Sequence, residues 1–424
     1  MQTQNDYDVV IVGGGPAGST AATVLSQHGR RVLVLEKEKF PRYHIGESLL
    51  PFGYFPLKRI GMIERMKASH FTKKYAVQFV SRDGKQSSPF YFHKHLDHEA
   101  AITWQVRRSE FDQMLLENAR EKGAEVREQT EATAVLREDG RVCGVRARSA
   151  DGAEYEVRTP MTIDASGRGA LSIKQYDWRN WDPKLNKVAV WTYYRGAKRD
   201  PGIDEGTTTV AFVPERGWFW YIPLHDDIVS VGVVADRDYL FRDGNDLEGV
   251  FNRQVRENAW IADHLAQGTR CDEFRITKEY SYRAEHAAED GLVLVGDAFA
   301  FLDPVFSSGV YLALRSGEMA ADVIHQGLAD GDLSAARFVP YADRMRREIE
   351  AMRRLVYAFY DKSFSFGGFI RARPEFHGPM TDCLIGNLDI DFSELFNTMG
   401  QFASIPEPLA YGRPRVAEAA AQGG

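Results

Sequence analysis

Cysteine is scarce in this chain of 424 residues, which contains only Cys143, Cys271 and Cys383. The three are far apart, odd in number and form no CxxC pair, so the sequence predicts neither a disulfide framework nor a cysteine-based zinc site. Free thiols are typical of a reducing compartment, and the protein is therefore expected to be cytoplasmic. No metal site is predicted.

Long apolar runs, a basic leader and an excess of basic residues are also missing. No stretch approaches the roughly 20 apolar residues that cross a bilayer, so no membrane span is predicted. Residues 1–6 carry no Lys or Arg ahead of the first apolar run, which predicts that there is no signal peptide. The formal net charge of -7 argues against a nucleic-acid partner, because such partners are bound through their phosphates.

A glycine-rich stretch near the N-terminus is the first positive signal. Residues 7–12 are apolar and β-branched, as in a buried parallel strand, and residues 13–18 read GGGPAG before an alanine-rich segment that predicts a helix. Gly13 permits a tight turn, Gly15 lets the backbone approach a pyrophosphate, and Gly18 lets the helix pack on the strand. The predicted phosphate-binding loop contains Gly13, Gly15, Pro16, Ala17 and Gly18.

A second strand is predicted at residues 31–35, and it ends in Glu36. An acid about 20 residues after such a loop accepts hydrogen bonds from the ribose of a dinucleotide. A glycine-rich turn that binds nothing is the alternative, although the loop lies between a predicted strand and helix and the acid follows it. This end of the chain does not distinguish NAD from FAD.

The distinction comes from residues 291–298, another buried strand, which ends in Gly296 and Asp297. It resembles the second FAD fingerprint of flavoprotein monooxygenases with the fold of p-hydroxybenzoate hydroxylase, which implies that Asp297 holds the ribityl chain. The same resemblance places Arg108 near the phosphates and the ribityl chain, and Asp164 near the adenosine. For Arg108 and Asp164 singly, a surface salt bridge or a turn residue is the alternative. FAD is the expected cofactor.

Pro304 and Gly309 bracket the next loop, and a helix is predicted from near Val310. The N-terminus of a helix presents free N–H groups and the positive end of its dipole. In FAD folds this end faces the isoalloxazine and stabilises negative charge on the reduced flavin, and the same amides suit a small anion such as chloride. Ser307, Ser308 and Gly309 are the predicted halide-binding residues.

Three segments make the resemblance more specific. Residues 44–51, residues 303–310 and the WxWxIP pattern at residues 218–223 are similar to those of flavin-dependent halogenases that act on phenolic or pyrrolic, often carrier-bound substrates. Alignment to the KxGAxF segment of that family places its lysine at Lys74. The full set of predicted cofactor-binding residues is Gly13, Gly15, Pro16, Ala17, Gly18, Glu36, Arg42, Ser48, Arg108, Asp164, Gly296, Asp297, Pro304, Gly309 and Val310.

The resemblance also implies a mechanism. A separate NAD(P)H-dependent flavin reductase supplies FADH2, dioxygen gives a flavin hydroperoxide, and chloride or bromide attacks it to release hypohalous acid. Lys74 captures or orients that acid, through ammonium hydrogen bonds or as a haloamine if its pKa is lowered, and an electron-rich aromatic ring is substituted. The bulky, rigid indoles of Trp218 and Trp220 would keep the substrate off the flavin. Enzymes of this kind belong to secondary metabolism, including antibiotic biosynthesis.

The chain departs from the family pattern at several positions. Ala76 and Val77 replace smaller residues, and Phe306 stands where tryptophan halogenases carry a Glu, which argues against free tryptophan as the substrate. The neighbouring Lys73 leaves the choice of lysine ambiguous, and Lys73 with Lys74 would alternatively form a solvated strand edge. The two tryptophans alternate along a predicted strand, so a place in the core of a sheet is an equal alternative to a barrier.

The predicted fold is mixed α/β, with a Rossmann-like FAD-binding domain of the glutathione-reductase and p-hydroxybenzoate-hydroxylase type, an antiparallel-sheet substrate domain and a helical C-terminal region. The basic run at residues 344–354 is interpreted as a solvated helix face, the aromatic residues of 359–369 as core, and the tail at residues 415–424 as frayed. The FAD-binding domain is predicted to comprise residues 1–74, 105–178 and 286–334, the substrate domain residues 75–104 and 179–285, and the C-terminal region residues 335–424.

The leading hypothesis is a FADH2- and O2-dependent halogenase of an electron-rich aromatic small molecule, either free or tethered to a carrier protein. A non-halogenating FAD oxidoreductase, similar to geranylgeranyl reductases or aromatic hydroxylases, is the alternative, and it need not carry WxWxIP together with the lysine. A non-catalytic FAD-binding or partner-binding module is a third hypothesis, which nothing in the sequence favours.

Overall fold

A six-stranded sheet carries the glycine-rich loop. In the computed structural model, which describes residues 7–416, its strands lie in the order β18-β19-β11-β1-β2-β7 and are parallel except for the β18–β19 pair. All four residues of β1 are buried between β2 and β11, which accounts for the continuous apolar run. The bounds are β1 Val9–Val12, β2 Val32–Leu35, β7 Glu125–Arg127, β11 Met161–Asp164, β18 Ala288–Glu289 and β19 Leu292–Leu294.

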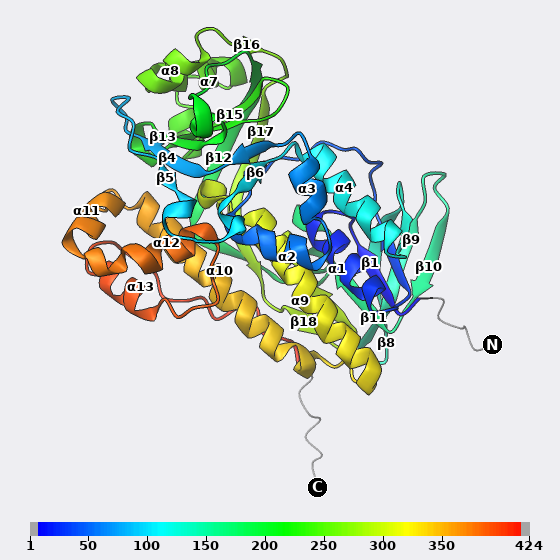
Figure 1. The fold of residues 1–424 in the computed structure, drawn as a ribbon. Helices are drawn as coiled ribbons and strands as arrows, with labels where there is room; N and C mark the ends of the chain where they lie inside the picture. The colour runs from blue at the N-terminus through cyan, green and yellow to red at the C-terminus, as the bar shows by residue number, and fades with distance from the viewer. Residues whose placement is uncertain (1–6, 417–424) are drawn as a thin grey trace.

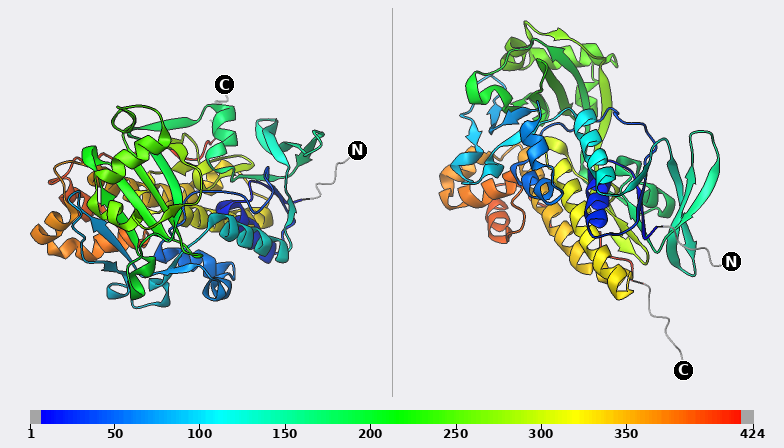
Figure 2. Two further views of the ribbon diagram at one scale, coloured as in Figure 1. Left: turned by 90° about the horizontal axis from the view of Figure 1, so that it is seen from above. Right: turned by 45° about the vertical axis from the view of Figure 1, so that its right-hand side comes forward.

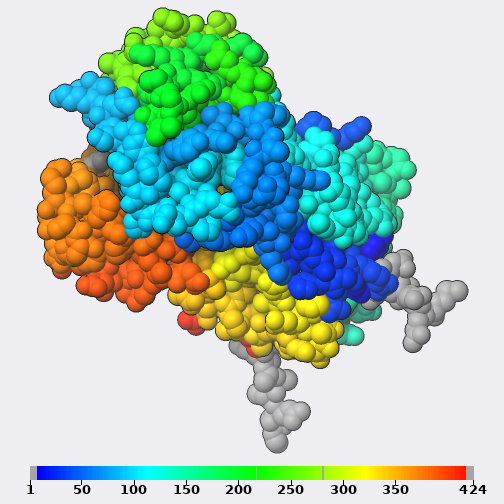
Figure 3. All heavy atoms as spheres, viewed as in Figure 1, coloured from blue at the N-terminus to red at the C-terminus, as the bar shows by residue number. Residues whose placement is uncertain are grey.

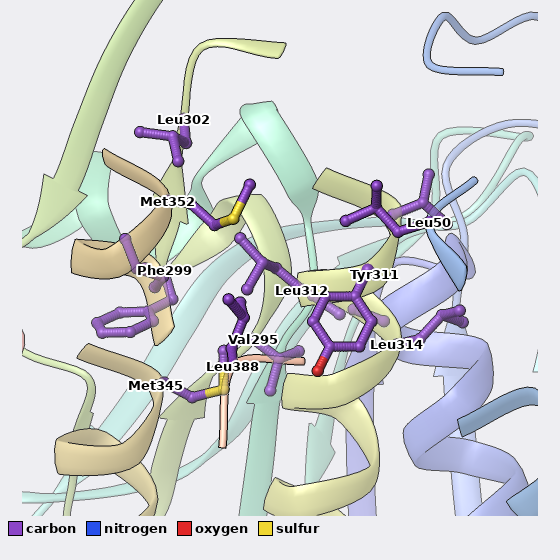
Figure 4. Close-up of a cluster of buried hydrophobic side chains, with 14 of the residues drawn as sticks. Leu50, Val295, Phe299, Leu302, Tyr311, Leu312, Leu314, Met345, Met352 and Leu388 are labelled. Carbon is purple, nitrogen blue, oxygen red and sulfur yellow. The ribbon is translucent and has the colours of Figure 1, made fainter. Parts of the chain in front are cut away.

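Three long helices pack beside this sheet. α1 (Pro16–Gln27) crosses α9 (Gly309–Asp330) so closely that a Cβ on Gly317 would lie 2.4 Å from the Ala17 carbonyl oxygen. α10 (Val339–Tyr360) runs alongside α9, and both are drawn in yellow to gold in Figure 1. Met352 of α10 packs near Leu312 of α9 in the buried cluster of Figure 4. This packing fixes the N-terminus of α9 close to the glycine-rich loop.

A nine-stranded sheet, drawn mostly in green in Figures 1 and 2, forms the second layer. Its order is β20-β17-β12-β15-β14-β13-β4-β5, with β16 paired to β12. The sequence predicts an antiparallel sheet, but β4 pairs with β13 in parallel, and this part of the prediction is wrong. The two strands are far apart in the chain, so no hairpin fixes their relative direction. The bounds are β4 Ala76–Val80, β5 Phe90–Tyr91, β12 Arg179–Arg195, β13 Thr208–Phe212, β14 Trp218–Pro223, β15 Ile228–Ala235, β16 Thr269–Arg270, β17 Arg275–Ala284 and β20 Ala300–Phe301.

Two small sheets complete the strands. One contains β8 (Glu131–Glu138), β9 (Arg141–Arg148) and β10 (Glu154–Arg158), and the other pairs β3 (Thr72–Lys74) with β6 (Thr103–Gln105). The blue segment that carries β3 fills the face between the green sheet and the yellow and orange helices in Figure 3. The remaining helices are α2 Tyr54–Arg59, α3 Ile63–Ala68, α4 Arg108–Glu121, α5 Leu171–Tyr176, α6 Arg237–Leu240, α7 Leu247–Arg256, α8 Ala259–Leu265, α11 Phe366–Ala372, α12 His377–Ile385 and α13 Ser393–Met399.

The C-terminal region corrects one interpretation and confirms another. Arg353, expected on a solvated helix face, is buried, because its Nε donates to Asp182 Oδ2 at 2.6 Å and its Nη1 lies 3.1 Å from Glu350 Oε2. The aromatic stretch is core as predicted, with Phe359 and Phe369 each only 2% exposed. Of the tail predicted to be frayed, residues 417–424 lie outside the described residues. Across residues 7–416, no helix has the length and apolar character needed to span a membrane.

Candidate active site

A cavity of about 1050 Å³ lies where the glycine-rich loop, the segment after β2, strand β14 and the start of α9 meet. Most residues predicted from the sequence line it, whereas Gly18, Lys74, Asp164 and Ser308 do not. The predicted residues that line it are Gly13, Gly15, Pro16, Ala17, Glu36, Arg42, Ser48, Arg108, Trp218, Trp220, Gly296, Asp297, Pro304, Ser307, Gly309 and Val310.

The glycine-rich loop has the geometry that its sequence predicts. Gly13 has φ +101°, and a Cβ there would lie 2.4 Å from the Ala165 carbonyl oxygen. A Cβ on Gly18 would lie 1.9 Å from the Gly13 carbonyl oxygen, so only glycine lets α1 pack this close to β1. Gly15 faces the cavity, and the nearest atom to a Cβ added there would be Arg42 Nη2, at 3.4 Å. Gly13 and Gly15 both line the cavity, and of the three glycines only Gly15 would have room for a Cβ, so its backbone is open to a ligand.

Glu36 is buried at the end of β2 and lines the cavity. Its Oε2 accepts a hydrogen bond from the Gly14 amide at 2.7 Å, and its Oε1 accepts one from the Glu38 amide at 2.8 Å. These two bonds hold the carboxylate beside the loop and fix the direction in which its remaining lone pairs point.

Arg108 and Arg42 share a buried carboxylate that the sequence analysis did not single out. Arg108 donates to Asp112 through Nε at 2.7 Å and Nη2 at 2.9 Å, and Arg42 Nη1 donates to the same carboxylate at 2.8 Å. Arg108 Nη1 also donates to the Ile45 carbonyl oxygen at 2.8 Å. Arg108 is 5% exposed and Asp112 0%, so the surface salt bridge considered for Arg108 does not apply.

The two aspartates predicted from the FAD fingerprints lie in different environments. Asp297 lines the cavity, and burial raises its pKa to about 6 against the opposing charges of Arg168 and Arg108. Asp164 is buried and does not line the cavity, and it accepts hydrogen bonds from Ser166 N at 3.0 Å and Ser172 N at 2.8 Å. Asp164 thus orders the loop after β11, as in the turn-residue alternative.

The loop before α9 is shaped by its own polar groups. Asp303 Oδ1 accepts from the Val305 amide at 3.1 Å, and the Ser307 amide donates to the Pro304 carbonyl oxygen at 2.8 Å. Ser307 adopts φ +56°, and α9 begins two residues later at Gly309. The Ser307 N–H is therefore already used, and the amides at the start of α9 remain without intrahelical partners.

The two indoles of the WxWxIP segment lie in the core of a sheet, as one interpretation predicts, and they also face the cavity. Trp218 and Trp220 are 2% and 8% exposed on β14, and both also line the cavity. Trp218 Nε1 donates to the Tyr360 hydroxyl at 2.9 Å, and that hydroxyl donates to Asp303 at 2.8 Å. Trp220 Nε1 donates to Ser230 Oγ at 3.0 Å. Both rings are thereby locked in place at the cavity wall.

Lys74 is buried, and the solvated strand edge is wrong for this residue. It is 1% exposed, whereas Lys73 on the opposite face of β3 is exposed. Lys74 Nζ donates to Ser48 Oγ at 2.8 Å and to the Leu49 carbonyl oxygen at 3.1 Å, and Ser48 lines the cavity. Burial lowers the pKa of Lys74 from 10.5 to about 7.

Comparison with known proteins shows the family to which this chain belongs. The sequence matches the tryptophan halogenase family over residues 8–96 and 82–365. The chain belongs to this family of flavin-dependent halogenases. The 1H-pyrrole-2-carbonyl-[peptidyl-carrier protein] chlorinase of Pseudomonas fluorescens is 31% identical over 392 residues, 87% of each chain. The corresponding brominase of Pseudoalteromonas luteoviolacea is 33% identical over 346 residues, 81% of this chain and 83% of its own.

Solved halogenases share the fold of this chain. The flavin-dependent brominase Bmp2 superposes with a TM-score of 0.85 at 29% identity, covering 93% of this chain and 98% of its own. The myxobacterial chondrochloren halogenase CndH superposes with a TM-score of 0.78 at 35% identity, covering 92% of each chain. The predicted fold class, enzyme class and FAD cofactor are therefore confirmed, and the non-halogenating alternative is not favoured.

The cavity of this halogenase fits FAD. The open backbone at Gly15 suits a pyrophosphate, and the N-terminus of α9 supplies positive potential at the far end of the same cavity. Glu36 and Asp297 stand at the cavity wall, where a ribose and a ribityl chain would offer hydroxyl donors. These are the residues that would hold the cofactor, and each was identified from the sequence.

Sequence reasoning missed a buried acid in this halogenase. Glu47 is 3% exposed and lines the cavity, its Oε1 accepts from the Tyr193 hydroxyl at 2.7 Å, and burial raises its pKa to about 7. The Tyr193 hydroxyl lies 3.1 Å from that of Tyr43, which receives the Trp191 indole N–H at 2.7 Å. The acidic residue inside the 44–51 motif was the available signal, but nothing in the sequence shows its burial or its tyrosine partners.

Proposed function

We propose that this halogenase substitutes an electron-rich aromatic ring carried as an acyl group on a carrier protein, and that Lys74 transfers the halogen. The observation that carries this proposal is the buried amine of Lys74, one hydrogen bond away from the wall of the flavin cavity through Ser48. Buried amines with lowered pKa values are typical of nucleophilic lysines.

Reduced FAD, when bound and supplied with dioxygen, provides the oxidising power that converts halide to hypohalous acid. The amide of Gly309, which lines the cavity at the start of α9, and that of the preceding residue Ser308, which does not line it, are the donors that we assign to the halide, since the Ser307 amide is bonded to Pro304. The Ser307 side chain lines the cavity and is the further donor of this predicted set.

The neutral amine of Lys74 has a free lone pair on Nζ that can accept the halogen. Its two N–H bonds match the two acceptors, Ser48 Oγ and the Leu49 carbonyl oxygen, and its lone pair then stays available. The amine attacks hypohalous acid to form a haloamine and water, and the aromatic ring takes the halogen while its proton leaves and the amine is restored. No ion pair with Lys74 occurs among the described residues to hold it protonated.

The halogen-transfer step should accelerate as pH rises through about 7. The fraction of neutral Lys74 grows across this range, because its pKa is lowered to about 7, and the neutral form is the nucleophile. The measurement is the single-turnover rate of product formation between pH 5.5 and 9, with pre-reduced flavin so that the reductase does not contribute. A rate that falls across this range would instead assign the ammonium form as the active one.

Trp218 and Trp220 are the residues that we assign to separating the ring from the flavin. Their indoles line the cavity wall and are held by Tyr360 and Ser230, so they do not move aside without breaking hydrogen bonds. An aromatic ring kept beyond this wall meets the halogen only through Lys74, which favours halogenation over direct oxygen transfer.

Two observations support a carrier-tethered ring. The relatives with 31% and 33% identity are named for a pyrrole-2-carbonyl group on a peptidyl carrier protein. Phe306 packs against Phe359 and Phe366, at ring distances of 5.8 and 6.0 Å, at the position where a carboxylate would hold a free amino acid. Aromatic side chains at this position offer no ionic partner to a free substrate.

The substrate assignment is tested by comparing free and tethered forms of one ring. Pyrrole-2-carboxylate and its thioester on a phosphopantetheinyl carrier protein are each incubated with the enzyme, FAD, a flavin reductase, NADH and bromide. We expect bromination of the tethered ring alone, read by intact-protein mass. Bromination of the free acid at an equal or greater rate would contradict the tethering and leave the halogenase assignment intact.

A further inference from the structure

Three side chains distant in the sequence meet outside the flavin cavity. His70 precedes β3, Glu110 lies in the first turn of α4, and His225 lies in the turn between β14 and β15. One ligand atom from each lies within 4.8 Å of the others. His70 Nε2 is 2.8 Å from Glu110 Oε2, and His225 Nε2 is 3.3 Å from Glu110 Oε1. The two imidazole rings are 4.2 Å apart and nearly perpendicular.

His225 is buried without a hydrogen bond. Its side chain is 6% exposed, and within the part of the chain that the structure describes neither ring nitrogen makes a hydrogen bond of acceptable geometry. Metals bind the neutral form of an imidazole, through a ring nitrogen that carries no proton. A buried polar group left without a partner is costly, and a metal bound at Nε2 would satisfy it.

The second nitrogen of His225 faces a carboxylate. Nδ1 lies 3.0 Å from Asp226 Oδ2, the neighbouring residue in the turn. Histidines that bind metals through one nitrogen commonly donate the other N–H to a carboxylate, which fixes the tautomer and orients the ring. In this structure Nδ1 is close to Asp226 without hydrogen-bond geometry, and Nε2 is the nitrogen that faces Glu110. A metal bound at Nε2 would leave the proton on Nδ1, within reach of the Asp226 carboxylate.

A neighbouring cation, Arg107, contacts two carboxylates at the cluster. It lies 3.1 Å from Glu110 Oε1 and 3.5 Å from Asp226 Oδ2, whereas Glu110 Oε2 faces His70. The cluster opens into a groove of about 640 Å³, which Lys73 and Arg199 also line. Arg199 is paired with Glu205 and Asp227, so part of this positive charge is neutralised. The groove gives water access to an additional ligand position.

We propose that His70, Glu110 and His225 form a zinc site. Two imidazole nitrogens and one carboxylate oxygen, with one position open to solvent, form a ligand set that zinc prefers. The groove shares no lining residue with the flavin cavity. Zinc would join the first turn of α4, next to Arg108, to the turn that follows β14, and so hold the flavin-binding layer against the strand that carries both indoles.

Zinc binding is tested on the full chain after removal of metals with a chelator. We expect calorimetric titration with Zn²⁺ to show one ion per chain and a rise in melting temperature on binding, and Co²⁺ to give a visible absorption band. His70→Ala, at an exposed position that does not affect the core, and Glu110→Gln should each lose the site. Asp226→Asn should weaken binding ~10–100-fold through the orientation of His225.

The matched control is His28→Ala. His28 stacks on His325 at a ring distance of 4.0 Å and lies 3.3 Å from Asp322. The substitution therefore removes an imidazole from another pair of a histidine and a carboxylate, and leaves the proposed site complete. Its zinc affinity should equal that of the unmodified chain. The proposal would be overturned if the unmodified chain bound no stoichiometric zinc, or if His70→Ala and Glu110→Gln bound zinc as tightly as the unmodified chain. These readouts need neither flavin nor turnover, so they are independent of the proposed halogenation.

Discussion

Replacing Lys74 with methionine is expected to abolish halogenation and, at neutral and acidic pH, to stabilise the folded chain. The activity is lost because methionine has no amine to accept the halogen. The stability rises because the folded state holds Lys74 with a pKa of about 7, against 10.5 in the unfolded chain, so a protonated lysine is disfavoured in the core.

The effect of Lys74 on the free energy of unfolding depends on pH. Between about 7 and 10.5 the unfolded chain binds more protons at Lys74 than the folded chain, so the stability contributed by Lys74 rises with pH across that range. Below about pH 7 the folded chain bears the full free-energy cost of a buried, protonated Lys74, ~5 kcal/mol at 1.36 kcal/mol per pKa unit. Methionine removes this cost but loses about 1 kcal/mol for each hydrogen bond that Lys74 makes. The advantage of Lys74→Met should therefore be largest near pH 6 and shrink toward pH 10.

Denaturant unfolding of both chains at pH 6, 8 and 10 measures this difference, and bromination of the tethered ring measures the activity. Lys73→Met is the matched control, since Lys73 is exposed on the same strand and should change neither quantity. A Lys74→Met chain that is less stable at every pH would show that the ammonium is favourably solvated in the folded state. Retained bromination would remove Lys74 from the mechanism.

Replacing Asp112 with alanine is expected to destabilise the fold by about 3–5 kcal/mol and to weaken FAD binding. Asp112 is fully buried and accepts hydrogen bonds from both Arg42 and Arg108, so its removal leaves two guanidinium groups without their carboxylate. Both arginines line the flavin cavity, and Arg108 also holds the backbone of the 44–51 segment at Ile45. Loss of the ion pair should loosen that segment.

The control lies on the same helix. Glu121, also on α4, pairs with Arg65 at 2.6 Å, but their side chains are 52% and 41% exposed, so Glu121→Ala should cost at most ~1 kcal/mol. Thermal unfolding and FAD titration by flavin fluorescence quenching are the measurements. Equal effects of the two substitutions would show that the buried carboxylate is not the anchor that its hydrogen bonds indicate.

The sequence predicts the parts of the fold that depend on local chemistry. Gly13 and Gly18 were assigned a turn and a close helix–strand contact, and the structure shows the positive φ and the short approach that demand glycine there. The direction of β4 was not predictable, because its partner β13 lies more than a hundred residues away and no turn links them. Arg353 was misjudged for a similar reason, since its partner Asp182 comes from a remote strand.

In the site, too, local features are predictable from the sequence, and contacts between remote residues are not. The alternation of β14 placed both indoles on one face, and the structure confirms that this face is buried and lines the cavity. Sequence pattern left Lys73 and Lys74 undecided, because only the pairing of β3 with β6 turns one lysine inward and the other to solvent. Glu47 and His225 acquire their roles from partners far along the chain, Tyr193 and Glu110, and spacing alone carries no signal for such contacts. Asp112 lies four residues after Arg108, a helical spacing that does indicate a pair, but its second partner, Arg42, is remote.

The most direct test of the account is whether the oxidising power generated in the flavin cavity is used on halide. The carrier-tethered ring is incubated with the enzyme, FAD, a flavin reductase, NADH and dioxygen, with and without bromide, and the product mass is recorded. We predict replacement of hydrogen by bromine that requires bromide and is absent in Lys74→Met. Addition of oxygen to the ring, or turnover of the ring without halide, would contradict the account.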